Sequence, residues 1–515
     1  MIQIMDEMIS LGQTLDFFQN LDKKEVKQFI KFLNSPFFGA QPAQINLVIF
    51  LKDFPDETKT EFSISELYDI LFPEESGNSG TKLAFRRKKL FNTFSDLNLN
   101  FQKFIAVTAL EHDPLQQQYY LVRRYARSDN PRLYRKALNA FDSLIPRERD
   151  GFKRHMARFQ YFDFLFYAPL NDPFHKKHTE GLLKEMAHEL ETSFLYLRMD
   201  LFCNWLYRGK IVQGNLAQEE IDNLVRQAGQ YPKAAFPDLH IYRQLLELGN
   251  QMNRKDMVEA IFEDLRLYCR QIDRILARNF LVHLMNYCTL NYFRYSSDFL
   301  EFKIRLGEWG AGEGILFFQI GDDAAGFRDK AEREWEVGIQ DDLFLDLAIT
   351  LIGAKDRYAE ALGFIRENFS KLPAEKQHVA RNMALTYYYF HTDRFWDAAG
   401  CLDQVRSNEY KYAFRYHSMK VRIEYELFLH DPGRLNVAAS AVEAFKKYIL
   451  RNSLEWEESR RVLYRNLGWY LERMIDFQLS DPRKKLLIRK KLSDSLAVKR
   501  PAAADWVRKK IEELA

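Results

Sequence analysis

Apolar residues recur every three or four positions along most of the chain, rather than at every second position. Val26, Phe29, Ile30 and Leu33, for example, fall on one side of a helix but on both sides of a strand. Gly (22) and Pro (15) are few for 515 residues, which disfavours an all-β protein with its many turns. We therefore expect an all-α protein of stacked antiparallel helical hairpins, a TPR-like α-solenoid, with an N-terminal helical domain.

The first 110 residues carry clear helix boundaries. Ser63 and Glu66 have the spacing of a capping box, so a helix should begin there and stop at Pro73. A polar loop follows, and one long helix is predicted from about Lys82 to Leu110. Asp22 is a further candidate N-cap, for a helix that contains Val26 to Leu33.

Small and large apolar residues repeat in the C-terminal half. Ala361 and Ala398 occupy equivalent positions, 37 residues apart, at the predicted close approach of two helices. The first repeat contains Leu345, Ala348, Ile352, Ala361, Ile365 and Pro373, and the second contains Leu385, Tyr389, Ala398, Leu402 and Val405. These positions resemble the signature of tetratricopeptide (TPR) repeats, which implies helical hairpins that bind peptides or proteins. A non-repetitive helical bundle is the alternative.

Five segments follow from these patterns. We expect an N-terminal helical domain at 1–112, a middle region of helical hairpins at 113–306, and a Gly-rich break and connector at 307–334. TPR-like repeats should occupy 335–480, and a basic helical tail 481–515. The break is placed at Gly307, Gly310, Gly312 and Gly314, which we interpret as a hinge between helical blocks.

The net charge of +3 conceals two basic zones in an otherwise acidic chain. Residues 1–80 hold 6 basic and 13 acidic side chains, whereas residues 81–160 hold 17 and 7. Basic zones are typical of proteins with polyanionic partners, and tyrosines between the arginines would suit base stacking. The candidate nucleic-acid contacts are Arg86, Arg87, Lys88, Lys89, Arg123, Arg124, Arg127, Arg135 and Lys136.

The second basic zone is a predicted amphipathic helix near the C-terminus. Its apolar residues would face the protein, and its cations could bind an acidic partner or a membrane surface. The candidate partner-binding residues are Arg483, Lys484, Lys485, Arg489, Lys490 and Lys491. For both zones, a solvated face that pairs with the protein's own acidic segments is the alternative.

The first basic zone also carries a resemblance. Ser65, Glu66, Leu67, Leu71 and Pro73, followed by Arg86 and Leu90 on the next helix, resemble the winged-helix domain of antibiotic-regulator-type transcriptional activators. That family also has a TPR-like domain after the winged helix. The resemblance implies that residues 86–89 face DNA. Two departures are evident: Phe72 replaces a tryptophan, and the predicted helix continues where the family has a β-hairpin wing.

No residue pattern indicates catalysis or a cofactor. P-loop and nucleophile-elbow motifs are missing from the sequence, and Gly310-x-Gly312-x-Gly314 lacks dinucleotide-binding spacing. His175, His178, Glu185 and His188, with a second E-x-x-H at Glu375 and His378, are the best metal candidates, but their Lys-rich, polar surroundings favour solvated helix faces, and we expect no metal site. The aromatic run 387–390 is interpreted as core packing, with a ligand groove as the alternative.

The compartment and the function follow only in outline. The acidic N-terminus does not resemble a secretory signal, and Cys203, Cys269, Cys288 and Cys401 are too dispersed for a disulfide framework. We expect a cytoplasmic, non-enzymatic scaffold or adaptor that binds a protein or peptide on its helical repeats. A transcriptional regulator that binds nucleic acid through residues 82–136, with the repeats as sensor or oligomerisation module, is the alternative.

Overall fold

The computed structural model describes most of the chain and divides it into two units. Described are residues 8–19, 21, 23–52, 61–75, 82–128, 130–167, 179–209, 218–294, 298–319, 337–354, 357–405, 410–452 and 458–514. The first unit consists of Met1–Arg124 and Gly321–Arg333, and the second of Tyr125–Ile320 and Glu334–Ala515. Asp22, the predicted N-cap, lies outside the described residues.

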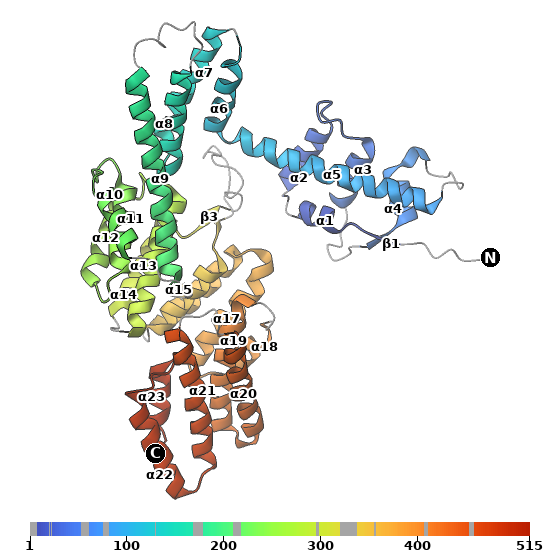
Figure 1. Ribbon diagram of the computed structural model, residues 1–515. Coiled ribbons are helices and arrows are strands. Elements are labelled where there is room, and N and C mark those ends of the chain that lie inside the picture. Colours follow the sequence, from blue (N-terminus) through green and yellow to red (C-terminus); the bar gives the residue numbers. More distant parts are fainter. Residues whose placement is uncertain are drawn as a thin grey trace, which may run out of the picture. The chain divides into compact units, whose positions relative to one another are not determined.

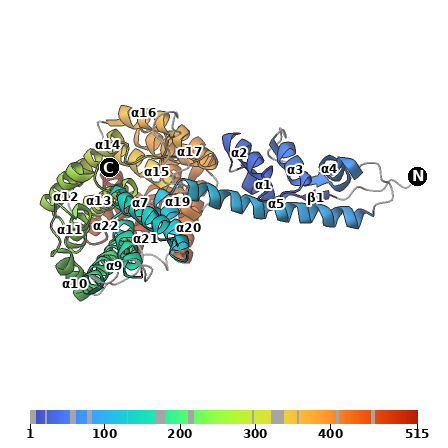
Figure 2. The same cartoon turned by 90° about the horizontal axis from the view of Figure 1, so that it is seen from above.

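The first unit is built around one long helix. Its elements are β1 (Met8–Ser10), α1 (Gly12–Gln19), α2 (Lys23–Leu33), α3 (Pro42–Lys52), β2 (Glu61–Ser63), α4 (Ile64–Leu71), the 3-10 turn η1 (Pro73–Glu75), α5 (Leu83–Glu111) and α6 (Pro114–Tyr125). Helices α1 to α4 all pack along α5, as Figure 2 shows. Strands β1 and β2 form a short antiparallel ladder, with Ile9 opposite Phe62, which the sequence pattern did not predict.

Two predictions for this unit are confirmed. The Ser63 hydroxyl accepts a hydrogen bond from the Glu66 amide at 3.2 Å, and α4 begins directly after this cap. Helix α5 runs without interruption through residues 98–110. Its buried residues, among them Leu90, Phe94, Leu97, Phe101 and Phe104, recur every three or four positions and hold α1 to α4 in one core.

The second unit consists of consecutive helices joined by short connections. Its helices before the Gly-rich stretch are α7 (Pro131–Leu144), η2 (Ile145–Arg147), α8 (Gly151–Phe166), α9 (Thr179–Gly209), α10 (Gln218–Ala228), α11 (Pro237–Gly249), α12 (Lys255–Tyr268), α13 (Arg274–Arg294) and α14 (Asp298–Gly312). A two-residue ladder, β3 (Phe318–Gln319) with β4 (Val337–Gly338), comes next. The chain is therefore all-α apart from these short strands.

The remaining helices continue the array. They are α15 (Asp341–Gly353), α16 (Tyr358–Asn368), η5 (Phe369–Lys371), α17 (Ala374–His391), α18 (Phe395–Asp403), α19 (Tyr410–His430), η6 (Pro432–Arg434), α20 (Leu435–Asn452), α21 (Glu458–Leu479), α22 (Pro482–Leu496) and α23 (Ala504–Glu512). Each helix packs on its successor from α8 to α23. Figure 1 shows this succession from α8 through α14 to the C-terminal helices.

Packing between alternate helices makes the array a stack of hairpins. Helix α9 packs on α11, α11 on α13, α15 on α17, and α17 on α19. The predicted hairpins are present as α15/α16 and α17/α18, and Ala361 and Ala398 are fully buried at their second helices. A small side chain at these positions lets two helix backbones approach closely. The hairpin prediction is thus confirmed, while the likeness to TPR repeats stays a prediction.

Two of the four glycines that suggested a hinge, Gly307 and Gly310, lie inside a helix instead. Gly307 and Gly310 belong to α14, where a methyl group on Gly310 would lie 2.3 Å from Leu281 and one on Gly307 would lie 2.6 Å from Leu347. These glycines therefore permit close helix packing rather than bending. One buried cluster extends from Leu195 to Leu427 and includes Leu306, Leu316 and Phe344, so the core continues across this stretch.

The C-terminal helices share a second core in this unit. Helix α19 contributes Val421, Tyr425 and Phe428 to it, and α23 contributes Val507 and Ile511. The chain turns into α23 at Ala503, whose φ of 55° is left-handed, and the Ala502 amide donates to the Leu463 carbonyl at 2.8 Å. The last helix is thereby fixed against α21 and α22.

Among the described helices, none is both long and apolar enough to cross a bilayer. Cys203 and Cys288 are buried thiols, and Cys269 and Cys401 are half-buried; all four are free. Burial raises the pKa of each thiol, so none has the lowered pKa of an activated nucleophile.

Candidate functional site

The four basic residues at the start of α5 divide into two pairs. Arg86 and Lys89 turn towards α4: the Arg86 guanidinium lies 5.1 Å from the Tyr68 ring centroid and 3.9 Å from the Asp69 carboxylate. The Lys89 ammonium forms an ion pair with Glu75 and lies 4.1 Å above the Phe72 ring. These two cations join α5 to α4 and η1.

Glu75 anchors the same contact from the other side. It accepts hydrogen bonds from Lys89 and from the hydroxyl of Tyr68, and these bonds lower the pKa of its carboxyl. Burial is the main reason that the pKa of Tyr68 is raised. The three polar side chains thus link α5 to α4 and η1.

Arg87 and Lys88 form the second pair and are exposed. They belong to a continuous exposed face of α5, and the Arg87 guanidinium lies 5.8 Å from the ring centroid of Phe91 on the same face. The polar side chains of Asn92 and Ser95 lie further along this face. Of the residues predicted at 86–89, Arg87 and Lys88 are therefore the two that are exposed to solvent.

The other candidates of the first basic zone are distributed over both units. Arg123 and Arg124 are exposed on α6 in the first unit, and Arg123 lies 5.6 Å from the Tyr119 ring centroid. Arg127, Arg135 and Lys136 are exposed in the second unit. Arg135 lines a shallow depression with Asn130, Pro131 and Arg132. The structure thus does not bring the zone together in one unit.

The basic tail is helical, and most of its cations are exposed. Lys485 is the exception, since its ammonium lies 5.4 Å from the Phe477 ring centroid. The side chain of Asp481 caps α22 through the Lys484 amide at 3.0 Å. Exposed to solvent in this helix are Arg483, Lys484, Arg489, Lys490 and Lys491.

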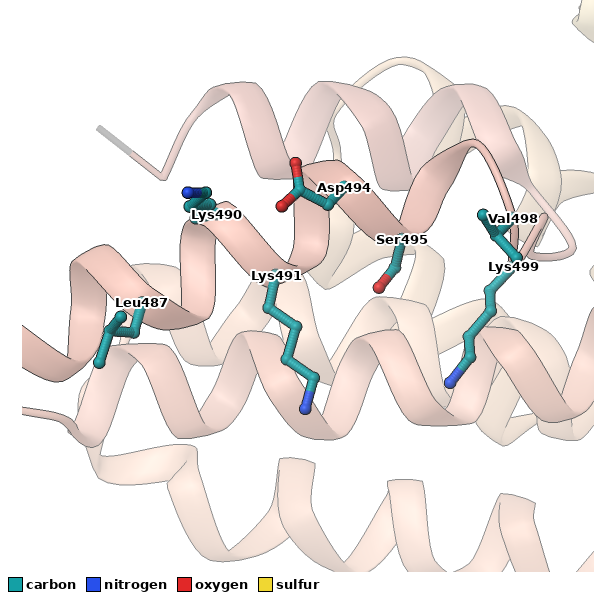
Figure 3. A pocket seen from close by; sticks show the side chains of 7 residues that line it. All are labelled: Leu487, Lys490, Lys491, Asp494, Ser495, Val498 and Lys499. Carbon is teal, nitrogen blue, oxygen red and sulfur yellow. The ribbon is translucent and has the colours of Figure 1, made fainter.

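Two leucines of α22 interrupt its charged surface. Leu486 and Leu487 are 71% and 68% exposed, while Leu492 is fully buried against the second core. Figure 3 shows a shallow depression that Leu487 and Val498 line together with lysines, with the ammonium groups of Lys491 and Lys499 on one side. Asp494 and Ser495 complete the lining, so the depression combines apolar, cationic and acidic side chains.

The metal candidates do not assemble within the described residues. Glu185 and His188 are exposed on α9, His378 is exposed on α17, and no three His, Cys, Asp or Glu side chains of the described part of the chain could hold one ion. His175 and His178 lie outside the described residues.

Sequence reasoning missed a buried charged cluster between α8 and α9. The Nδ1 atom of His155 lies 2.6 Å from Glu189 Oε2, and Arg158 Nε lies 3.1 Å from Oε1 of the same carboxylate. The imidazole is stacked between Tyr196 and Phe236. No sequence motif marks this cluster, because its members lie 34 residues apart and meet only through the helix pairing.

A second missed feature lies on α19. Arg415 and Arg422 are seven residues apart and therefore share one face of the helix. Arg422 is 7% exposed; its Nε donates to the Ser418 carbonyl at 3.0 Å, and its guanidinium lies 5.2 Å from the Phe390 ring centroid. Burial lowers the pKa of this guanidinium. The tyrosines Tyr387 and Tyr464 act to raise the pKa of both guanidinium groups.

No protein-family model, curated protein or solved structure matches the chain. The function must therefore be inferred from the geometry described above.

Proposed function

We propose that the protein is a non-enzymatic scaffold that binds a protein or peptide partner on its stack of helical hairpins. The observation that carries this proposal is the packing of α15 on α17 and of α17 on α19. Stacked hairpins with such contacts form extended surfaces, and proteins of this architecture work by binding peptides or proteins.

The lining of these helices also supports the proposal. Tyr387, Tyr388, Tyr389 and Tyr416 are half-buried, so each exposes part of its side chain to solvent. Tyrosine is enriched at protein interfaces because it combines a large contact area with little loss of conformational entropy.

Affinity capture tests this function. The full chain is immobilised, a nuclease-treated lysate of the native cells is passed over it, and bound proteins are cross-linked and identified by mass spectrometry. The proposal expects a stoichiometric partner with cross-links to α15–α21. Capture no better than on a bead without protein, or cross-links confined to the first unit, would count against it.

A second function, nucleic-acid binding, is favoured by the exposed face of α5. Arg87 and Lys88 could contact phosphates, and Asn92 could hydrogen-bond a base, since arginine and asparagine are common readers of duplex DNA. The predicted resemblance to winged-helix regulators assigns the same helix to DNA.

A salt series on duplex DNA tests this second function. Affinity should fall steeply with salt, and R87A/K88A should reduce the slope of log K against log[salt] by about 2, because each lost phosphate contact lowers it by about 0.9. The matched control is K27A/K31A, which removes two exposed lysines from α2 of the same unit. Equal slopes for both variants would exclude this face as the DNA contact.

A further inference from the structure

Helix α9 is apolar on two opposite sides, of which one is buried and the other is exposed. Tyr196, Met199 and Cys203 lie in the core of the second unit. In a globular protein, a helix that is apolar all round is normally buried all round, because apolar surface is unfavourable in water. The large side chains on the opposite side are nevertheless 45–60% exposed, and they are Leu183, Leu190, Phe194, Leu197, Leu201 and Trp205.

The exposed side of α9 has the spacing of a coiled-coil seam. The helix continues without a break over 31 residues (Figure 1). Its exposed apolar residues follow one another at steps of four, three, four, three and four positions, a pattern that repeats every seven residues and lies against a second helix in coiled coils. We define the outer seam of α9 as Leu183, Ala187, Leu190, Phe194, Leu197 and Leu201, all of which are exposed.

Two opposite charges border the outer seam on one side. Glu191 is exposed there, and the half-buried Arg198 follows seven residues later on the same border. The Arg198 guanidinium lies 5.7 Å from the ring centroid of Phe194, which keeps it beside the seam. Among the described residues, the ion pairs that α9 forms involve other side chains than these two. The border therefore carries a carboxylate and a guanidinium that are open to an external partner.

The outer seam is complementary to itself when two copies meet in opposite directions. A two-fold axis between Phe194 and Leu197 places Phe194 of each copy against Leu197 of the other. The same axis places Leu190 of each copy against Leu201 of the other. Every large side chain in the middle of the seam thus meets another large apolar side chain, as an isologous interface requires.

The border charges agree with this antiparallel arrangement. The axis that pairs the seam residues also brings Glu191 of each copy opposite Arg198 of the other, so the attractive pair forms twice. In a parallel arrangement, the residues opposite Glu191 and Arg198 would be Met186 and Ser193, which carry no charge. The charges therefore favour the antiparallel arrangement over the parallel one.

We propose that a second copy of this chain docks on the outer seam of α9, with the two helices antiparallel. The protein is then a symmetric dimer in which each copy covers the exposed apolar side of the other. A second copy is the occupant because one surface supplies both the apolar residues and both charges of the contact. This inference is independent of the proposed scaffold function, which uses α15–α21.

Sedimentation velocity of the full chain over a range of concentrations tests this inference. We expect a dimer that dissociates on dilution. L197A should raise the dimer dissociation constant about 100-fold, because each of the two copies loses one buried leucine and each loss is worth about tenfold. The matched control is L450A, which truncates a leucine of α20 that is 78% exposed and should leave the dissociation constant unchanged.

An exchange of the border charges tests the direction of the two helices. E191R and R198E each place like charges opposite one another, so each should weaken the dimer about tenfold. E191R/R198E restores opposite charges across the antiparallel interface and should recover the wild-type dissociation constant. Circular dichroism shows whether each variant is folded, and if L197A unfolds, the charge exchange alone decides the result.

Four results overturn the inference. They are a monomer at every concentration, equal dissociation constants for L197A and L450A, a double exchange that is no tighter than E191R alone, and binding of phosphatidylglycerol vesicles in place of dimerisation that L197A abolishes. The last result would assign the outer seam to an anionic membrane surface. None of them bears on capture of a partner by α15–α21, so the scaffold function stands or falls separately.

Discussion

Lys510 on the last helix forms an ion pair with Glu426 of α19, at a distance of 2.8 Å. Both side chains are removed from solvent, with the lysine 10% and the glutamate 2% exposed. The indole of Trp506 donates to the same carboxylate at 2.7 Å, and its ring lies against Phe390 and Tyr425. Glu426 thus obtains its counter-ion from Lys510, which lies 84 residues further along the chain.

Removal of Lys510 should therefore destabilise the protein. K510A leaves the Glu426 charge buried without its cation, and the loss of one partner of a buried pair costs about 3 kcal/mol. The free energy of unfolding, measured by urea titration, should fall by that amount. The neighbouring Lys509 is 59% exposed and reaches Glu513 at 4.0 Å, so K509A should change the free energy by less than about 0.5 kcal/mol. Equal effects of the two variants would refute a buried pair.

The carboxyl of Glu148 should make the stability of the fold depend on pH. Burial raises the pKa of its carboxyl, and the nearby charges of Asp150 and Asp273 raise it further. A carboxyl with a raised pKa stabilises the fold below its unfolded pKa, near 4.3, and this contribution is lost as pH rises through the folded value. E148Q should thus be more stable than wild type at pH 7 and equally stable at pH 3.5.

Denaturant unfolding of both proteins across this pH range is the measurement for E148Q. The control is E443Q, because a hydrogen bond from Lys447 lowers the pKa of the Glu443 carboxyl. A lowered pKa gives stability that is present above the unfolded value, so E443Q should bring no gain at pH 7. A gain for E148Q that persists unchanged at pH 3.5 would show that charge burial is not its cause.

The sequence was sufficient for the local structure but not for the distant contacts. The cap at Ser63, the long helix α5 and the hairpins around Ala361 and Ala398 follow from residue spacing, because helix periodicity and capping are local properties. The β1–β2 ladder was missed, since Ile9 and Phe62 lie 53 residues apart and each strand has three residues. Gly310 was misinterpreted because a glycine that allows bending and a glycine that allows close packing look the same in a sequence.

The candidate sites, too, could be predicted only in part from the sequence. Spacing alone cannot separate Arg86 and Lys89, which contact α4, from Arg87 and Lys88, which are exposed. The buried arginine of α19 was missed for a related reason. An arginine in a helical pattern reads as a surface residue, and only the packing of α19 among its neighbours reveals that Arg422 is buried.

Gly310 offers a direct test of its role in packing. G310A would place a methyl group 2.3 Å from Leu281 and 2.9 Å from Leu316, so it should lower the free energy of unfolding by about 1–3 kcal/mol. A hinge glycine would instead tolerate the change. G312A is the matched control in the same helix, because nothing lies within 4 Å of its methyl position. Thermal unfolding that ranks G310A equal to or above G312A would restore the hinge interpretation.

Lys89 and Lys88 are adjacent in sequence, but their replacement by alanine should have different effects on stability and on DNA binding. K89A removes the ion pair with Glu75 and the contact with Phe72, so we expect a loss of about 1 kcal/mol in the stability of the first unit. K88A, which removes an exposed side chain, should change stability by less than about 0.5 kcal/mol. If α5 binds DNA, K88A should weaken binding at low salt more than K89A does. Chemical unfolding and DNA titration of the two variants measure this crossed pattern. A larger stability loss in K88A than in K89A would contradict the division of the basic residues of α5 into a pair that joins α5 to α4 and η1 and a pair that faces solvent.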